Sequence, residues 1–170
     1  MVLADVKKRR PDIRIHMAGW DVSDWKVPFD YVNHGAMKLE ELSPLYNRCA
    51  AALVMSLTNL SLLPLELLSC GTIPVVNDAP NNRLVADNPN IDYVPLSPGA
   101  LAAELIRIVD ADDQVEASRR AAAPRERTSS IRGATAAWAA DTSRAARGRA
   151  CASSRGPSRE LRRSVRVSMP

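Results

Sequence analysis

Residues 56–78 read SLTNLSLLPLELLSCGTIPVVND and show the clearest structural pattern of the chain. The apolar run AALVMS (51–56) predicts a strand, LPLELLSCG (63–71) predicts a helix that ends at its glycine, and IPVVN (73–77) predicts the next strand. Strand, helix and strand in this order are typical of a parallel crossover unit. One carboxylate, Glu66, lies among the leucines of the predicted helix.

The same alternation extends in both directions from this unit. Further strands are predicted at 13–19, 29–35 and 92–96, and further helices at 2–10, 39–49 and 98–110, with a short helix or turn at 81–87. Pro44 is expected to be tolerated poorly within the helix at 39–49 unless it lies near the start. Apolar strands that alternate with helices predict an α/β fold with a doubly wound, parallel, Rossmann-like sheet.

Composition places the chain among single-domain intracellular proteins. Its 170 residues suit one domain, and no apolar run approaches the roughly 20 residues that a membrane span needs. The N-terminus shows no signal-peptide pattern. The three cysteines, Cys49, Cys70 and Cys151, have no zinc-site spacing and form no disulfide framework. We therefore expect a cytoplasmic protein with neither a metal site nor a cofactor.

Charge divides the chain into two regions. Residues 124–170 contain 11 arginines, no lysine and three acidic residues, a net charge of +8, whereas residues 1–123 have a net charge of −4. Few branched aliphatic residues occur after about residue 120, so we expect an ordered domain at 1–120 and a basic Arg/Ala/Ser-rich tail at 121–170 that is disordered or weakly helical.

Three interpretations of the tail follow from its composition. It is most simply a solvated tail with no partner. A basic tail also binds anionic membranes or nucleic acid by releasing counterions, although no specific nucleic-acid motif occurs here. Alternatively, arginine without lysine, rich in Ala, Gly, Ser and Pro, is what a GC-rich gene gives when it is translated out of frame; sequencing the coding DNA near Ala121–Pro124 would test this hypothesis.

The loop that follows the strand at 51–56 is the candidate binding site. Ser61 is a candidate N-cap, and Pro64 falls in the first turn of the helix, where its missing N–H costs nothing. The N–H groups of Leu62 and Leu63 would then be unoccupied and available to a diphosphate. Glu66 either accepts hydrogen bonds from sugar hydroxyls or simply complements the helix dipole.

The segment VNHGAMKLEELSPLYNRCAAALVMSLTNLSLLPLELLSCGTIPVVND (32–78) resembles the C-terminal, donor-binding domain of GT-B-fold retaining glycosyltransferases of family 4, closest to bacterial rhamnosyltransferase-like members. The similarity covers about residues 1–110. It implies a partial glycosyltransferase domain that transfers a sugar, with rhamnose as first guess, from a dTDP- or UDP-linked donor to a saccharide acceptor.

The resemblance also implies roles for single residues. Glu66, the glutamate of "PLE", would bind the ribose, and the backbone N–H groups of Ser61, Leu62 and Leu63 would hold the diphosphate. The backbone of Gly35, Ala36 and Met37 would lie against the base. Thr58 and Asn59 stand near the position of the family's first glutamate and could bond a sugar hydroxyl without supplying its charge. The catalytic residues stay unassigned.

The resemblance further implies parts that precede Met1. In the family a strand and a "GR…K" segment open the donor domain, and an N-terminal acceptor-binding domain comes before them. The opening strand is the central one of the 3-2-1-4-5-6 order. We therefore expect a sheet that has a gap or a changed pairing, in a fragment that is inactive alone and contacts the inner face of the membrane peripherally if at all.

Outside the loop, the turn APNNR (79–83) with Asn77 and Asp78 either contacts the donor or simply forms a turn, with Arg83 as the cation to test. His16 and His34 are interpreted as structural. The alternative function is a non-catalytic nucleotide- or phosphate-binding α/β module that docks through its basic tail. A misread gene product without a native role is a third hypothesis.

Overall fold

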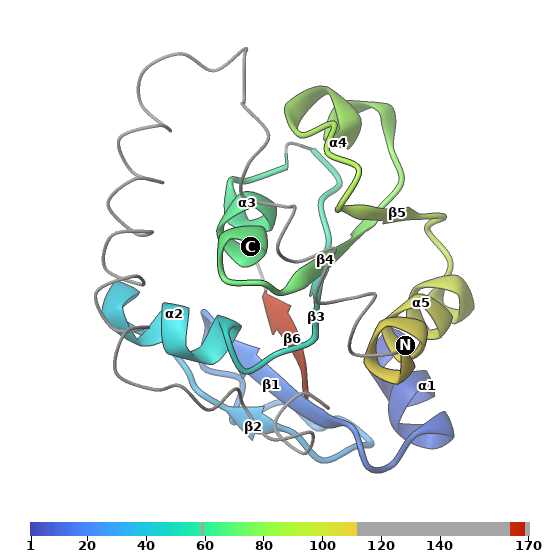
Figure 1. Ribbon diagram of the computed structural model, residues 1–170. Helices are drawn as coiled ribbons and strands as arrows, with labels where there is room; N and C mark the ends of the chain where they lie inside the picture. Colours follow the sequence, from blue (N-terminus) through green and yellow to red (C-terminus); the bar gives the residue numbers. More distant parts are fainter. Residues whose placement is uncertain (59, 112–163, 169–170) are drawn as a thin grey trace.

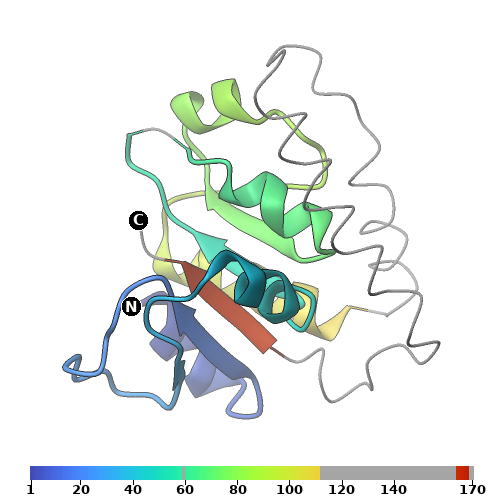
Figure 2. The same ribbon diagram turned by 90° about the vertical axis from the view of Figure 1, so that its left-hand side faces the viewer.

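Six parallel strands form a single sheet in the computed structural model, which describes residues 1–58, 60–111 and 164–168 (Figures 1 and 2). The strands are β1 (Arg14–Ala18), β2 (Val32–Asn33), β3 (Ala51–Val54), β4 (Ile73–Asn77), β5 (Asp92–Val94) and β6 (Ser164–Ser168). The helices are α1 (Val2–Arg9), α2 (Leu39–Tyr46), α3 (Leu63–Ser69), α4 (Pro80–Val85) and α5 (Pro98–Asp110). The predicted α/β class with a parallel sheet is confirmed.

The strand order is β2-β1-β6-β3-β4-β5, and every neighbouring pair is parallel. If β6 is given the first place, this is the doubly wound order 3-2-1-4-5-6. The expected gap is therefore absent, and the alternative expectation, a changed pairing, is confirmed. The strand that fills the centre of the sheet comes from the far end of the chain (Figure 1, red).

The expectation of a disordered or weakly helical tail is wrong for Ser164–Ser168, which form a strand. This segment reads SVRVS, and its β-branched valines favour an extended strand. It pairs with β1 and β3 along its length, and Val165 is completely buried between them. Average composition over a long tail concealed these five residues. The rest of the expected tail lies outside the described residues, so the boundary at 120/121 stays a prediction.

Helices cover both faces of the sheet and enclose two different cores. The larger core lies between the sheet and the pair α1 and α5, which pack against each other (Figure 1). Leu101, Leu105 and Ile108 of α5 are its fully buried anchors. The second core lies under α2 and α3 and includes Tyr46 and Leu67. This second face leads directly to the candidate binding loops.

The end of α3 follows its sequence signal closely. Gly71 has a φ of 77°, the left-handed conformation that a glycine adopts readily. The Gly71 N–H donates to the Leu68 carbonyl at 2.9 Å, and the Thr72 N–H donates to the Leu67 carbonyl at 2.9 Å. These two bonds form a Schellman motif, which turns the chain back into β4.

The helix predicted at 39–49 is shorter than expected, because α2 ends at Tyr46. Pro44 lies inside it and has no N–H to donate to the Glu40 carbonyl. The Lys38 N–H donates to the Glu41 carboxylate at 2.9 Å, which satisfies one backbone group at the start of the helix.

Candidate functional site

The parallel strands place their carboxyl ends at one edge of the sheet, called here the carboxyl edge. The loop after β2 contains Gly35, Ala36 and Met37, and the loop after β3 contains Thr58, Ser61 and Leu62. Ligands of such sheets bind beyond this edge, where the strand order reverses. The structure thus brings the predicted residues that it describes to the expected edge. Asn59, also predicted, lies outside the described residues.

The start of α3 differs from expectation in its cap. Leu62, not Ser61, is the N-cap residue, and it has a helical φ and ψ. Ser61 is exposed, and its Oγ accepts a hydrogen bond from the Leu63 N–H at 3.4 Å, longer than an ordinary bond of this type. The Leu63 N–H, expected to be unoccupied, therefore has a weak local acceptor. A stronger anionic acceptor would compete with it readily.

Glu66 is half-buried in the first turn of α3. Its backbone N–H donates to the Leu62 carbonyl at 3.2 Å, so the turn that holds it is formed. A carboxylate at this place is stabilised by the unsatisfied N–H groups of the helix start. Its position within one turn of the candidate diphosphate loop agrees with both interpretations made from the sequence.

Two buried asparagines hold the β3 loop, a role that the sequence did not reveal. The Asn77 side chain bridges to Ser56: its Oδ1 accepts from the Ser56 N–H and its Nδ2 donates to the Ser56 carbonyl, both at 2.8 Å. Asn82 is fully buried and donates to the carbonyls of Asn77 at 2.9 Å and Ser56 at 3.3 Å. Beyond the last paired residues of β3 and β4, these amides supply the hydrogen bonds that the backbone of the loop needs. Their role is to shape the loop.

The neighbouring turn residues are also engaged within the protein. Asn81 donates to the Thr58 carbonyl, which adds a third amide to the support of this loop. Arg83 donates from Nε and Nη2 to the two carboxylate oxygens of Asp78 at 2.7 and 3.0 Å, and it lies 4.5 Å from the centre of the Tyr93 ring. The hydrogen bonds from Arg83 lower the pKa of the Asp78 carboxyl. Arg83, the cation proposed for testing, is therefore held by Asp78 and Tyr93.

The loop after β2 turns sharply at Gly35, whose φ is 58°. The Gly35 N–H donates to Asn33 Oδ1 at 3.0 Å, and its carbonyl accepts from the Gly19 N–H at 2.9 Å, which ties this loop to the end of β1. Ala36 is exposed, whereas Met37 packs against a small buried cluster. A backbone held in this way presents Ala36 to solvent at the carboxyl edge.

His16 and His34 form a pair beneath this loop. Nδ1 of His16 and Nε2 of His34 are 3.0 Å apart, and the two rings are stacked with their centroids 5.2 Å apart. Burial, followed by the positive charges of His34, Arg48 and Arg14, lowers the pKa of His16 to about 4. A neutral, largely buried imidazole agrees with the structural interpretation.

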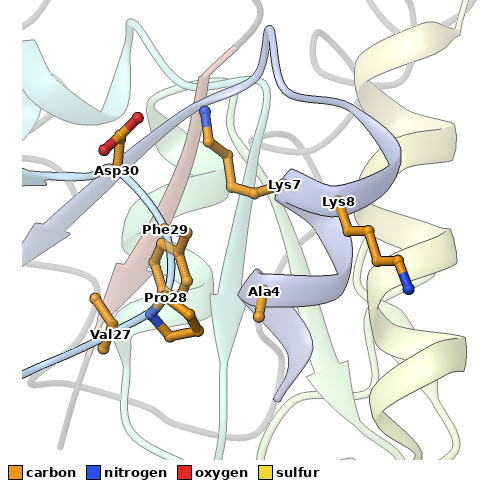
Figure 3. A pocket seen from close by; sticks show the side chains of 7 residues that line it. All are labelled: Ala4, Lys7, Lys8, Val27, Pro28, Phe29 and Asp30. Carbon is orange, nitrogen blue, oxygen red and sulfur yellow. The ribbon is translucent and has the colours of Figure 1, made fainter.

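The pocket in Figure 3 lies apart from these loops. It is lined by side chains of α1 and of the segment that precedes β2: Ala4, Lys7, Lys8, Val27, Pro28, Phe29 and Asp30. The ammonium of Lys7 donates to the carbonyls of Pro11 and Ile13 at 2.7 and 3.1 Å, so it is bound to the protein's own backbone. None of the predicted binding residues lines this pocket.

Metal and membrane features are absent from the described part of the chain. Within residues 1–58, 60–111 and 164–168, no group of three or more His, Cys, Asp or Glu side chains is placed to hold a metal ion. No helix among the same residues has the length and apolarity needed to cross a bilayer.

The structure defines the chain as an α/β domain with a parallel sheet, and comparison with known proteins gives its class as glycosyltransferase-like. Residues 1–106 match the family described as "WsaF, C-terminal domain". The chain belongs to this family of glycosyltransferase C-terminal domains.

One similar protein carries a functional name. The "O-antigen biosynthesis protein RfbC" of Myxococcus xanthus is 32% identical over 108 residues, which are 61% of this chain and 8% of that protein. The chain thus spans a small part of this much longer relative. No solved structure matches the chain.

Proposed function

We propose that this domain is the donor-binding half of a glycosyltransferase of surface-polysaccharide biosynthesis. It binds a nucleoside diphosphate-sugar at the carboxyl edge and transfers the sugar to a saccharide acceptor, together with an acceptor-binding domain. The observation that carries the proposal is the family match over residues 1–106. The name of the Myxococcus xanthus relative supports the choice of polysaccharide biosynthesis.

The residues of the loop after β3 take the diphosphate and the sugar in this proposal. The backbone N–H groups of residues 61–63 face the diphosphate, and the Glu66 carboxylate accepts hydrogen bonds from the ribose. Thr58 and Asn59 contact a sugar hydroxyl. The Asn77 and Asn82 amides support the loop rather than the ligand, because their Nδ2 groups donate to backbone carbonyls.

The loop after β2 completes the donor site. The backbone of Gly35, Ala36 and Met37 lies against the base, and the left-handed turn at Gly35 aims this loop toward the edge. We propose a dTDP- or UDP-linked donor, with rhamnose as the first sugar to test. We place the enzyme in the cytoplasm, at the inner face of the membrane where lipid-linked saccharides would serve as acceptors.

The proposed reaction is a sugar transfer of GT-B type. The acceptor hydroxyl forms a bond to the anomeric carbon, the bond from that carbon to the diphosphate oxygen breaks, and the hydroxyl proton leaves with the departing diphosphate or solvent. Negative charge develops on the leaving diphosphate, and N–H groups at a helix start stabilise such charge. In this reaction the domain binds and orients the leaving diphosphate.

Binding of dTDP, UDP and GDP to the full chain tests the proposal. Amide shifts in an NMR titration are expected to concentrate in residues 34–37 and 60–66 and to saturate. Glu66→Gln is expected to weaken binding about tenfold, since a hydrogen bond to a charged group contributes roughly 1.5–3 kcal/mol. Glu40→Gln is the matched control, because Glu40 occupies the first turn of α2 and is exposed.

The same titration with inorganic pyrophosphate distinguishes the transferase from the non-catalytic phosphate-binding module. Pyrophosphate that binds as tightly as UDP, with no effect of Glu66→Gln, would favour the phosphate-binding module. Binding that requires the ribose supports the transferase.

A further inference from the structure

The strand β6 is connected to the rest of the sheet unlike any other strand. The strands from β1 to β5 follow one another within residues 14–94, whereas residues 111–163 separate α5 from β6. Even so, β6 pairs with five residues of β1 and four of β3, in register with both. The strands β1 and β3 are thus adjacent to β6 in space but distant from it in sequence. They do not pair with each other, and the main chain of β6 connects them within the sheet (Figure 2).

The two strands beside β6 are also held together by contacts that do not involve it. On one face α1 packs against α5, and the Arg10 guanidinium at the end of α1 bonds the Asp110 carboxylate at the end of α5. Val6 of α1 and Leu105 of α5 are fully buried in the same core. The half of the sheet with β1 and the half with β3 therefore remain linked across this face.

The opposite face provides a second link, through α2. Leu45 of this helix packs with Ala18 of β1, and the adjacent Tyr46 packs in the cluster that contains Ala52 of β3. The space between β1 and β3 is thus covered on both faces. Adjacent strands lie about 4.8 Å apart, so the two walls are roughly 10 Å apart, which is room for one strand.

The chemistry of this space favours one kind of ligand. Both walls present main-chain N–H and C=O groups that need partners, and a parallel strand satisfies them on both sides. The register places Val165 beside Ile15 on one side and Ala51 on the other, and all three are buried in the core shared with α1 and α5. A β-branched apolar residue suits that position.

We propose that the space between β1 and β3 is a strand-binding groove, and that residues 164–168 of the same chain are its separable ligand. The strand leaves and re-enters while residues 1–111 keep their fold. The groove accepts an extended peptide in parallel orientation with an apolar β-branched residue at the place of Val165. This inference does not depend on the proposed transferase function.

Hydrogen exchange of the full chain tests the proposal through Val165→Asp. A buried unpaired carboxylate expels the strand. The main-chain amides of Arg14–Ala18 and Ala51–Val54 that face β6 are then expected to exchange roughly a hundredfold faster, whereas those of Ile73–Asn77 keep their protection. Val32→Asp is the matched control, because Val32 is a strand valine with 44% exposure; it should leave both sets unchanged.

A second measurement offers the groove a free strand. A fluorescent peptide with the sequence RRSVRVSMP, residues 162–170, should bind the Val165→Asp chain saturably, because the strand of that chain no longer occupies the groove. The unsubstituted chain should bind it far more weakly, since its tethered strand competes at a high effective concentration. The same peptide with aspartate in place of its first valine should not bind. Sedimentation should show a monomer whose mass is independent of concentration.

Several outcomes would overturn the proposal. Loss of protection at Ile73–Asn77 in Val165→Asp would make β6 an integral part of the core. Unchanged protection at β1 and β3 would mean that β6 does not occupy the groove. A peptide that fails to bind the Val165→Asp chain would show that the groove does not accept a free strand, and dimers that form with rising concentration would assign the groove to a second copy.

Discussion

The two faces of the sheet differ in that only one of them is covered by a long helix among the described residues. On one face α5 has 13 residues and buries Leu101, Leu105 and Ile108 in a core that extends from α1 to β5. On the other face α2 and α3 have eight and seven residues, and the loops that precede them carry the candidate binding groups. A cluster of buried side chains that includes Tyr46 and Leu67 supports this face, and the side-chain amides of Asn77 and Asn82 hold the loop after β3.

The difference separates stability from binding. The α5 face has the long apolar helix and no predicted binding residue. The α3 face has Glu66 together with asparagine amides that bond loop carbonyls. Substitutions on the two faces should therefore differ in kind: those under α5 should reduce global stability, and those near α3 should alter local order and ligand binding.

Leu105→Ala should give the largest effect. Leu105 is completely buried, and its truncation leaves a cavity under α5, the longest of the described helices. We expect a loss of about 3 kcal/mol in the free energy of unfolding, within the usual range of 2–5. Urea unfolding of the full chain measures it as a lower midpoint with an unchanged m-value.

Two further leucines make that measurement a test of the comparison. Leu67→Ala removes an equally buried side chain from α3 and should cost less, because a short helix relaxes into the cavity more readily. Leu84, with 87% exposure on α4, should change stability by less than about 0.5 kcal/mol when replaced by alanine. A larger loss for Leu67→Ala than for Leu105→Ala would reverse the roles of the two faces.

Acid is expected to lower the free energy of unfolding through His16. Its folded pKa of about 4 lies below the unfolded value of 6.5, so the unfolded chain binds more protons between these pH values. The contribution to stability is complete above pH 6.5 and is lost as the pH falls toward 4. His16→Gln should flatten this part of the curve of stability against pH, as measured by urea midpoints at pH 7, 6 and 5. An unchanged slope in the variant would assign the acid sensitivity to other groups.

Asn82→Ala should affect the loop after β3. Its side-chain amide donates to the carbonyls of Asn77 and Ser56, and the Ser56 carbonyl also accepts from the Asn77 amide. Removal therefore takes the Asn82 donor from the Asn77 carbonyl, at a cost of about 1–3 kcal/mol. Hydrogen exchange should rise first at residues 55–58. The neighbouring Asn81→Ala is the control and should cost less than about 1 kcal/mol, because Asn81 is only partly buried. Equal effects of the two changes would contradict a special role for the buried amide.

Much of the fold could be predicted because its signals are local. The range of α5 was predicted to the residue, since Pro98 starts it, apolar residues recur at helical spacing and neither Gly nor Pro occurs after its second residue. The end of α3 was equally clear from Gly71. The strand β6 could not be predicted in the same way, because its two partners lie far away in the sequence and its only apolar residues are two valines.

The candidate site shows the same limit. The carboxyl edge and Glu66 follow from the order of elements, which a sequence displays. The bonds between Asn77 and Ser56 do not follow from it, because an asparagine in a turn has the same local signal whether it contacts a ligand or a distant carbonyl. Likewise, the contact between Arg83 and Tyr93 forms only in the folded chain and has no local signal in the sequence.

A pair of glycines gives the smallest and most controlled test of the two regions. A Cβ added at Gly35 or at Gly99 would meet no atom within 4 Å, so neither substitution by alanine creates a clash. The two sites differ in backbone: Gly35, in the candidate site, has a φ of 58°, whereas Gly99 lies in the first turn of α5. Gly35→Ala should therefore cost about 1 kcal/mol from the left-handed conformation alone. Gly99→Ala should stabilise the chain by roughly 0.5 kcal/mol, because alanine has less freedom to lose. Thermal unfolding of both variants measures the difference, and a Gly35→Ala variant as stable as Gly99→Ala would show that the β2 loop relaxes to another conformation.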